Sequence, residues 1–202
     1  MGVKSVNSPL FDFFGHLWHN GEAMNIHPAL VHFPIALLML YAIFELISFG
    51  KLKRFTSWFY IKLTLLMSGF LFALPTLNTG ETAAELIGRD SSLWPIIMKH
   101  NNWASISVFL FGILTLIYLL VWIRDYPECD RVYKRLKANK YTAWPWSMLS
   151  RLAGMLYNSP LVWILALGGL VAIAITGALG GSLVHGPNAD PFVKFVLNLL
   201  GL

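Results

Sequence analysis

The sequence predicts an all-α integral membrane protein: a four-helix bundle with interfacial helices in one connecting loop and at the C-terminus. Of its 202 residues, 56% are hydrophobic, 14% are aromatic and only 12% are charged, whereas charged residues make up about 25% of a soluble domain. Four apolar runs have roughly the 20 residues that cross the hydrocarbon core. They lie at about 28–48, 57–77, 103–123 and 160–183.

These runs divide the chain into three parts. Residues 1–26 form an aromatic arm expected at the outer interface, residues 27–186 form the transmembrane domain, and residues 187–202 form an outer amphipathic tail. The 124–159 loop is rich in basic and tryptophan residues, and we expect interfacial helices there. Their lipid-facing side chains should be Trp144, Trp146, Met148, Leu152 and Leu156.

Prolines suggest where the spans begin, bend and end. Pro34 leaves the Leu30 carbonyl without its helical donor, which predicts a kink near residues 30–34 of the first span. The second span should end at Pro75. Asn78 followed by Glu81 is typical of a capping box, so a short surface helix is expected from about 79 to 87. Trp94-Pro95 is then expected to break the chain before the third span opens at residue 103.

Two ionisable residues fall inside apolar runs at similar depth. Glu45 lies late in the first span and Lys62 early in the second. Because a charge inside a membrane is costly unless it is paired, we predict a structural ion pair between Glu45 and Lys62. The competing possibility is that each side chain reaches the interface independently.

Basic residues are concentrated in two connections. They are Lys51, Lys53 and Arg54 after the first span, and Arg124, Arg131, Lys134, Arg135, Lys137, Lys140 and Arg151 after the third. The positive-inside rule places both loops in the cytoplasm, which predicts an inner-membrane, multi-pass protein with both termini outside. The net charge of +5 is explained by basic cytoplasmic loops that lie near anionic lipid headgroups, so no nucleic-acid partner is expected. The single cysteine, Cys129, permits no internal disulfide.

Four histidines are predicted on the side of the membrane opposite the basic loops. His27, His32, His100 and His185 lie at the outer mouths of spans one, three and four, and the basic loops contain none. Sites in helix bundles are built from residues on facing helices. His27 and His32 are five residues apart, about 140° around an ideal helix, so the two rings do not chelate a small ion from one helical face.

Three interpretations of these four histidines remain open. They suit the axial ligands of a b-type haem, because a haem iron takes one imidazole from each side. Asn78, Glu81 and Asn101 would then hydrogen-bond the ring nitrogens that face away from the iron. The small-residue face that includes Gly168, Thr176 and Gly180 would admit a flat macrocycle or a close helix. A zinc or copper site is the second interpretation, and simple helix capping is the third.

The chain resembles the predicted four-helix membrane proteins catalogued as domain of unknown function 2231. Its hallmark, H-P-x-x-V-H-F-P-I-x-L, is matched from His27 to Leu37, and weaker similarities are Thr79-Gly80-Glu81, His100 and a T-G-x-x-G-G sequence at 176–181. The similarity covers roughly residues 25–186. It departs from the family pattern around His185, where family members often have a tyrosine before a histidine-glycine pair. The resemblance implies the fold and a shared outer-side site, without a settled activity.

The leading hypothesis is a membrane electron-transfer subunit that binds haem b through these histidines. It would link a membrane quinol to an extracytoplasmic redox partner, as a subunit of a redox complex rather than a stand-alone enzyme. The alternative is a cofactor-free structural or assembly subunit of a larger membrane complex. No serine or cysteine nucleophile lies in a recognisable hydrolytic setting.

Overall fold

The computed structural model describes residues 26–48 and 55–202 and confirms the helical fold class. Four helices are long and apolar enough to cross a membrane by length and composition: His27–Leu46, Thr56–Ile87, Trp94–Asp125 and Leu161–His185. The chain is therefore a multi-pass membrane protein whose apolar helix surfaces fit contact with a lipid bilayer. The predicted aromatic arm lies outside the described residues, apart from Ile26, as do Lys51, Lys53 and Arg54.

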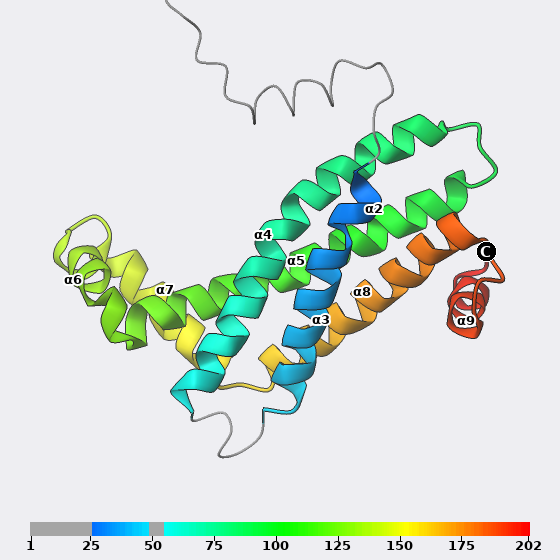
Figure 1. The fold of residues 1–202 in the computed structure, drawn as a ribbon. Helices are drawn as coiled ribbons and strands as arrows, with labels where there is room; N and C mark the ends of the chain where they lie inside the picture. Colours follow the sequence, from blue (N-terminus) through cyan, green and yellow to red (C-terminus); the bar gives the residue numbers. More distant parts are fainter. Residues whose placement is uncertain (1–25, 49–54) are drawn as a thin grey trace, which may run out of the picture.

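The helices form one bundle with additions at both ends (Figure 1). Its members are α2 (His27–Leu30), α3 (His32–Leu46), α4 (Thr56–Ile87), α5 (Trp94–Asp125) and α8 (Leu161–His185). At one end lie η2 (Pro127–Cys129), α6 (Asp130–Ala138) and α7 (Ala143–Tyr157), and beside the opposite end of α8 lies α9 (Pro191–Leu200). We call these the basic end, after Arg131, Lys134, Arg135 and Lys137 of α6, and the histidine end, after His27 and His100.

A continuous apolar core runs through the bundle. Leu38 and Tyr41 of α3, Leu66 of α4, Phe111 of α5 and Val162 of α8 are almost completely buried and belong to one cluster. The helices α3, α4, α5 and α8 therefore each bury one stripe of residues and leave other apolar residues exposed, whereas α2 has no fully buried residue. This is the pattern expected where lipid replaces water around the protein.

The first span is interrupted at the position expected from its prolines. Val31 separates α2 from α3 as a turn residue, and its backbone N–H still bonds the His27 carbonyl at 3.1 Å. Pro34 has no N–H to offer the Leu30 carbonyl. Val31 nevertheless keeps helical torsion angles, with φ −59° and ψ −28°, so α2 and α3 together make one apolar span.

The second span ends later, and the third span begins earlier, than the sequence predicts. α4 runs without a break through Pro75 to Ile87, because a proline removes one hydrogen bond while the bonds on either side continue to propagate the helix. Asn78 and Glu81 consequently lie inside α4 and form no capping box. α5 begins at Trp94 with Pro95 in its first turn, where a missing N–H costs nothing, so Pro95 starts a helix where a break was expected.

The loop at the basic end is helical, as expected, but two of its apolar side chains point inward. Trp144, Met148 and Leu152 of α7 are exposed. Trp146 is buried, and Leu156 packs against the main core. The prediction that all five face lipid is therefore wrong for Trp146 and Leu156, because α7 packs against α5 and uses one face for that contact.

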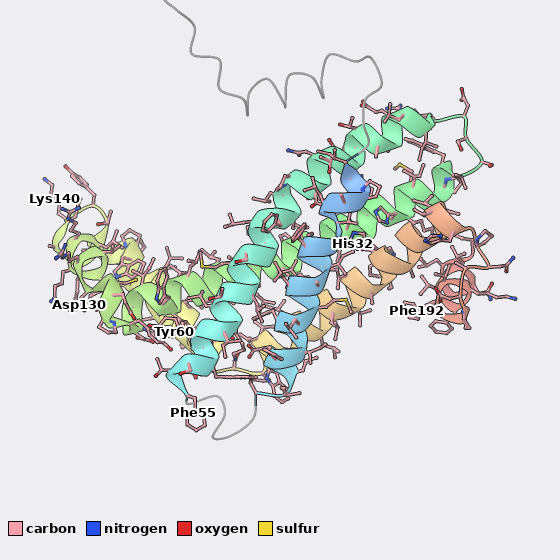
Figure 2. All side chains as sticks on the ribbon, in the orientation of Figure 1. His32, Phe55, Tyr60, Asp130, Lys140 and Phe192 are labelled. Atoms are coloured by element: carbon pink, nitrogen blue, oxygen red, sulfur yellow. The ribbon has the colours of Figure 1, made fainter. Side chains whose placement is uncertain are left out.

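The C-terminal tail forms an amphipathic helix, as its spacing predicts. Asp190 caps α9 by accepting hydrogen bonds from the backbone N–H groups of Phe192 and Val193, at 2.8 and 2.9 Å. One face packs on α8 through Val193, Val196 and Leu197. The other face leaves Phe192 exposed at the histidine end, whereas Tyr60, Asp130 and Lys140 mark the basic end (Figure 2).

Candidate functional site

Two of the four predicted histidines meet at the histidine end of the bundle. His27 comes from the short helix α2 and His100 from the first turns of α5. Their ring centroids are 6.4 Å apart, with an angle of 85° between the ring planes. Both side chains are partly buried, so the pair lies at the boundary between the bundle interior and its surface.

His27 is held by the backbone and a hydroxyl of α4. Its Nδ1 lies 3.1 Å from the Thr76 carbonyl oxygen and 3.1 Å from Thr79 Oγ1. The Thr79 hydroxyl donates to the same Thr76 carbonyl at 3.0 Å. Because a carbonyl oxygen only accepts, Nδ1 carries the proton in the neutral ring. This tautomer places the lone pair on Nε2, the nitrogen that would bind a metal.

His100 is held in the same way by α8. Its Nδ1 lies 3.0 Å from the Thr176 carbonyl oxygen and donates to it. Histidines that bind metals typically donate their other ring N–H to a carbonyl, a carboxylate or water, which sets the ring orientation. Both imidazoles therefore have the hydrogen bond that such a ligand needs.

A glycine lies against each ring. A Cβ added to Gly80 of α4 would be 3.0 Å from Cε1 of His27, and a Cβ added to Gly180 of α8 would be 3.3 Å from Cε1 of His100. Both distances are shorter than ordinary van der Waals contact. The two glycines thus allow each imidazole to lie directly against the backbone of the neighbouring helix.

The other two predicted histidines do not join this pair. His32 is exposed on α3, whose buried face contains Pro34, Leu38 and Tyr41, and His185 is exposed at the C-terminus of α8. Within residues 26–48 and 55–202, no three His, Cys, Asp or Glu side chains gather as a group that could hold a metal ion. A structural zinc site usually has three or four protein ligands, and the described residues bring only two of the four predicted histidines together.

The polar groups that hold the rings also differ from the expected ones. Asn78, Glu81 and Asn101 have exposed side chains, whereas the partners of the imidazoles are Thr76, Thr79 and Thr176. The sequence signal for them was a threonine four residues before a glycine, which occurs at 76–80 and again at 176–180. That spacing became informative only once the histidine contacts were known.

A second polar centre lies inside the bundle, away from the histidines. Lys62 Nζ lies 2.8 Å from Glu45 Oε2, and the two side chains are 1% and 0% exposed. The hydroxyl of the buried Tyr118 donates to the same carboxylate oxygen, and Lys62 lies 5.6 Å from the Tyr118 ring centroid. The ion pair expected between the first two spans is thus present, joined by a group from α5.

Comparison with protein-family models, with curated proteins and with solved structures finds no match for this chain. The resemblance to the domain of unknown function 2231 therefore stays a prediction from the motif at 27–37. No relative supplies an activity or a ligand, so the function is argued below from the residues alone.

Proposed function

We propose that this protein is a membrane electron-transfer subunit in which His27 and His100 would hold the iron of a b-type haem. The observation that carries the proposal is the meeting of these two imidazoles, each with Nδ1 bonded to a carbonyl of a neighbouring helix. A haem iron held by two histidines takes up and releases single electrons.

The donor set fits this group better than it fits zinc. A haem of the bis-histidine type takes two imidazoles from the protein, whereas zinc takes three or four protein ligands. Two imidazoles on opposite sides of one metal, each with a bond of about 2 Å, have centroids about 6 Å apart. The observed separation is 6.4 Å. Gly80 and Gly180 let each imidazole lie directly against the backbone of the neighbouring helix, which fixes the positions of the two donors.

The chain's own residues would set the properties of the site. The Thr76 and Thr176 carbonyls keep both rings in the tautomer that presents Nε2 and raise the basicity of that nitrogen. Their backbone positions on long helices limit how far each ring can rotate. In this proposal these two carbonyls replace Asn78, Glu81 and Asn101 as the groups that orient the ligands.

The charges support an orientation for the site. Arg131, Lys134, Arg135 and Lys137 lie in α6 at the end opposite the histidines. By the positive-inside rule, the basic end would face the cytoplasm, and the histidine end would face the outer side of the inner membrane. Electrons would then pass between a membrane quinol and an extracytoplasmic redox partner.

An absorption spectrum of the protein purified from haem-replete cells tests the proposal. We expect a b-haem α-band in the reduced-minus-oxidised difference spectrum, and we expect its loss in His27→Ala and in His100→Ala. His32→Ala and His185→Ala are matched controls that should keep the band, because both side chains are exposed and lie outside the pair. A wild-type protein without the band would refute haem binding.

The second candidate is a cofactor-free assembly subunit of a larger membrane complex. The observation that favours it is the apolar face of α9, where Phe192, Phe195 and Leu199 are at least half exposed although the helix lies beside the bundle. Replacing these three residues with serine should release the chain from any such complex during mild detergent extraction. A wild-type chain that is extracted as a pigmented monomer would exclude this candidate.

A further inference from the structure

We infer that the bundle consists of two copies of one helical hairpin, and that the histidine site is built from two equivalent half-sites where the copies meet. The first copy comprises α2, α3 and α4, and the second comprises α5 and α8. Both copies start at the histidine end, run to the basic end and return. Such parallel repeats are related by a pseudo-two-fold axis along the membrane normal.

The contacts inside each copy repeat residue by residue. In the first copy, Gly80 lies against the ring of His27 and Gly69 against the side chain of Leu38. In the second copy, Gly180 lies against His100 and Gly169 against Phe111. His27 and Leu38 of the first copy each precede their counterparts, His100 and Phe111, by 73 positions. Gly69 and Gly80 each precede Gly169 and Gly180 by one hundred positions. One pair of offsets therefore reproduces both contacts and, in addition, both threonine carbonyl bonds.

The buried faces follow the same offsets. The buried residues Pro34, Leu38, Tyr41, Ala42 and Glu45 of α3 correspond to Ser107, Phe111, Leu114, Thr115 and Tyr118 of α5, which are also buried. Four buried residues of α4, Lys62, Leu66, Gly69 and Ala73, correspond to Val162, Ala166, Gly169 and Ile173 of α8, which are also buried. The counterparts of the buried Leu63 and Ala83, Trp163 and Leu183, are only partly buried. Helical periodicity makes any two buried stripes similar, so the contacts above are the stronger argument.

Two residues contact their own counterparts, which locates the axis. His27 meets His100, and Glu45 accepts a hydrogen bond from Tyr118, 73 residues away. A residue lies next to its own symmetry mate only near a two-fold axis. These two pairs are separated by 18 residues, roughly 27 Å of helix, so the axis passes along the bundle from the histidine pair to the ion pair.

The copies have diverged at the ion pair but keep the same residues where they hold the rings. At the ion pair, Tyr118 stands opposite Glu45, and Val162 takes the position of Lys62. At the site, histidine faces histidine, and threonine and glycine recur at Thr76 and Gly80 and at Thr176 and Gly180. The second copy also carries the insertion that forms α6 and α7, and α9 covers its outer half.

The equivalence of the two half-sites limits the kind of ligand that the site would bind. Equivalent imidazoles approach from two sides of the axis, so the ligand is one that accepts two equivalent nitrogen donors on opposite sides, such as an iron macrocycle. This assignment of the ligand rests on the proposed function, whereas the duplication itself does not. It makes Thr76, Gly80, Thr176 and Gly180 positioning residues, two for each half-site.

The test compares Gly80→Val with Gly180→Val in the full-length protein, with Gly177→Val as control because a Cβ there meets nothing within 4 Å. The haem-independent readout is ¹⁵N NMR of histidine-labelled protein in detergent, with signals assigned from His27→Gln and His100→Gln. We expect Gly80→Val to abolish the Nδ1–H signal of His27 and Gly180→Val that of His100. Gly177→Val should change neither signal. If a valine variant does not fold, the corresponding alanine variant should shift the same signal.

The haem readout is retention of the α-band after purification. Because loss of a group that orients a metal ligand typically weakens binding about 10- to 100-fold, both glycine variants should lose haem to a similar extent. An effect in only one of them, or an equal effect in Gly177→Val, would overturn the two-half-site inference. Symmetric NMR changes in a protein that carries no haem would support the half-sites and refute the haem assignment.

Discussion

Lys62 Nζ lies 2.8 Å from Glu45 Oε2, and neither side chain reaches the surface of the bundle. The pair joins the first two spanning helices, and the Tyr118 hydroxyl ties the same carboxylate to a third helix. Two partners from two other helices thus meet one carboxylate oxygen of α3, so losing either partner should weaken the contact between three helices.

The first prediction concerns this pair. Lys62→Met leaves a buried carboxylate without its counter-charge, so we expect the free energy of unfolding to fall by about 3–5 kcal/mol. The double variant Glu45→Gln/Lys62→Met removes both charges and should recover most of that loss. Lys134→Met breaks the exposed pair with Asp130 and should change stability by no more than about 1 kcal/mol. Thermal unfolding in detergent measures all three, and an unaffected Lys62→Met protein would contradict the structural role.

The second prediction concerns the two glycines at the centre of the hairpins. A Cβ at Gly69 would be 2.7 Å from the Leu38 side chain, and one at Gly169 would be 2.8 Å from the Phe111 ring. Gly69→Ala and Gly169→Ala should therefore each destabilise the bundle by about 1–3 kcal/mol through overpacking. Gly177→Ala, in open space, should be neutral or up to about 1 kcal/mol more stable. A melting temperature raised by either of the first two variants would refute the close approach.

The third prediction concerns the start of α9. Asp190→Ala removes the oxygen that accepts from the N–H groups of Phe192 and Val193, a loss worth about 1 kcal/mol at a helix N-terminus. Hydrogen exchange of residues 191–200 should therefore accelerate roughly five-fold, because local opening becomes easier. Asp190→Asn should retain the slow exchange, since asparagine caps about as well. Equal exchange in the two variants would show that the cap does not hold the helix.

The fourth prediction concerns pH at the basic end. The Tyr60 hydroxyl donates to Glu128 Oε1 at 2.6 Å, and this bond, more than the backbone bond beside it, holds the pKa of the Glu128 carboxyl below its usual value. A carboxyl whose pKa is lower when folded stabilises the fold above its unfolded pKa and loses that effect as pH falls through the folded value. Tyr60→Phe should raise the Glu128 pKa and weaken this acid dependence.

Carboxyl ¹³C NMR titration of Glu128 measures the change directly. Tyr141→Phe is the matched control, because Tyr141 is exposed and distant from Glu128 in the chain. An identical Glu128 titration in the wild-type protein and in Tyr60→Phe would show that the hydrogen bond has no influence in solution.

Local features made several parts of the fold predictable. The length of the apolar runs identified the four spanning helices, the absent N–H of Pro34 identified the interruption at Val31, and two charges in apolar surroundings identified the Glu45–Lys62 pair. Pro75 and Pro95 were misread for a related reason. A proline has a small local cost, and whether a helix absorbs that cost depends on the hydrogen bonds and packing on both sides.

The duplication escaped sequence analysis because the copies share few residues and the repeat has no single period. The first helices are offset by 73 residues and the second by one hundred, since the second copy contains α6 and α7. Identical residues are few, and Gly69, Thr76 and Gly80 with their counterparts become recognisable only through the side chains they contact.

The sequence by itself determined that this chain enters a membrane, that the described residues include four long apolar helices, and that His27, His32, His100 and His185 lie near the ends of those helices. These properties depend on hydrophobicity and on distance along one helix. Only the tertiary structure decided that His27 meets His100 while His32 and His185 remain exposed. The physical reason is that the direction of a side chain across a bundle depends on which stripe of its helix is buried and on how closely glycines such as Gly80 and Gly180 let the neighbouring ring approach.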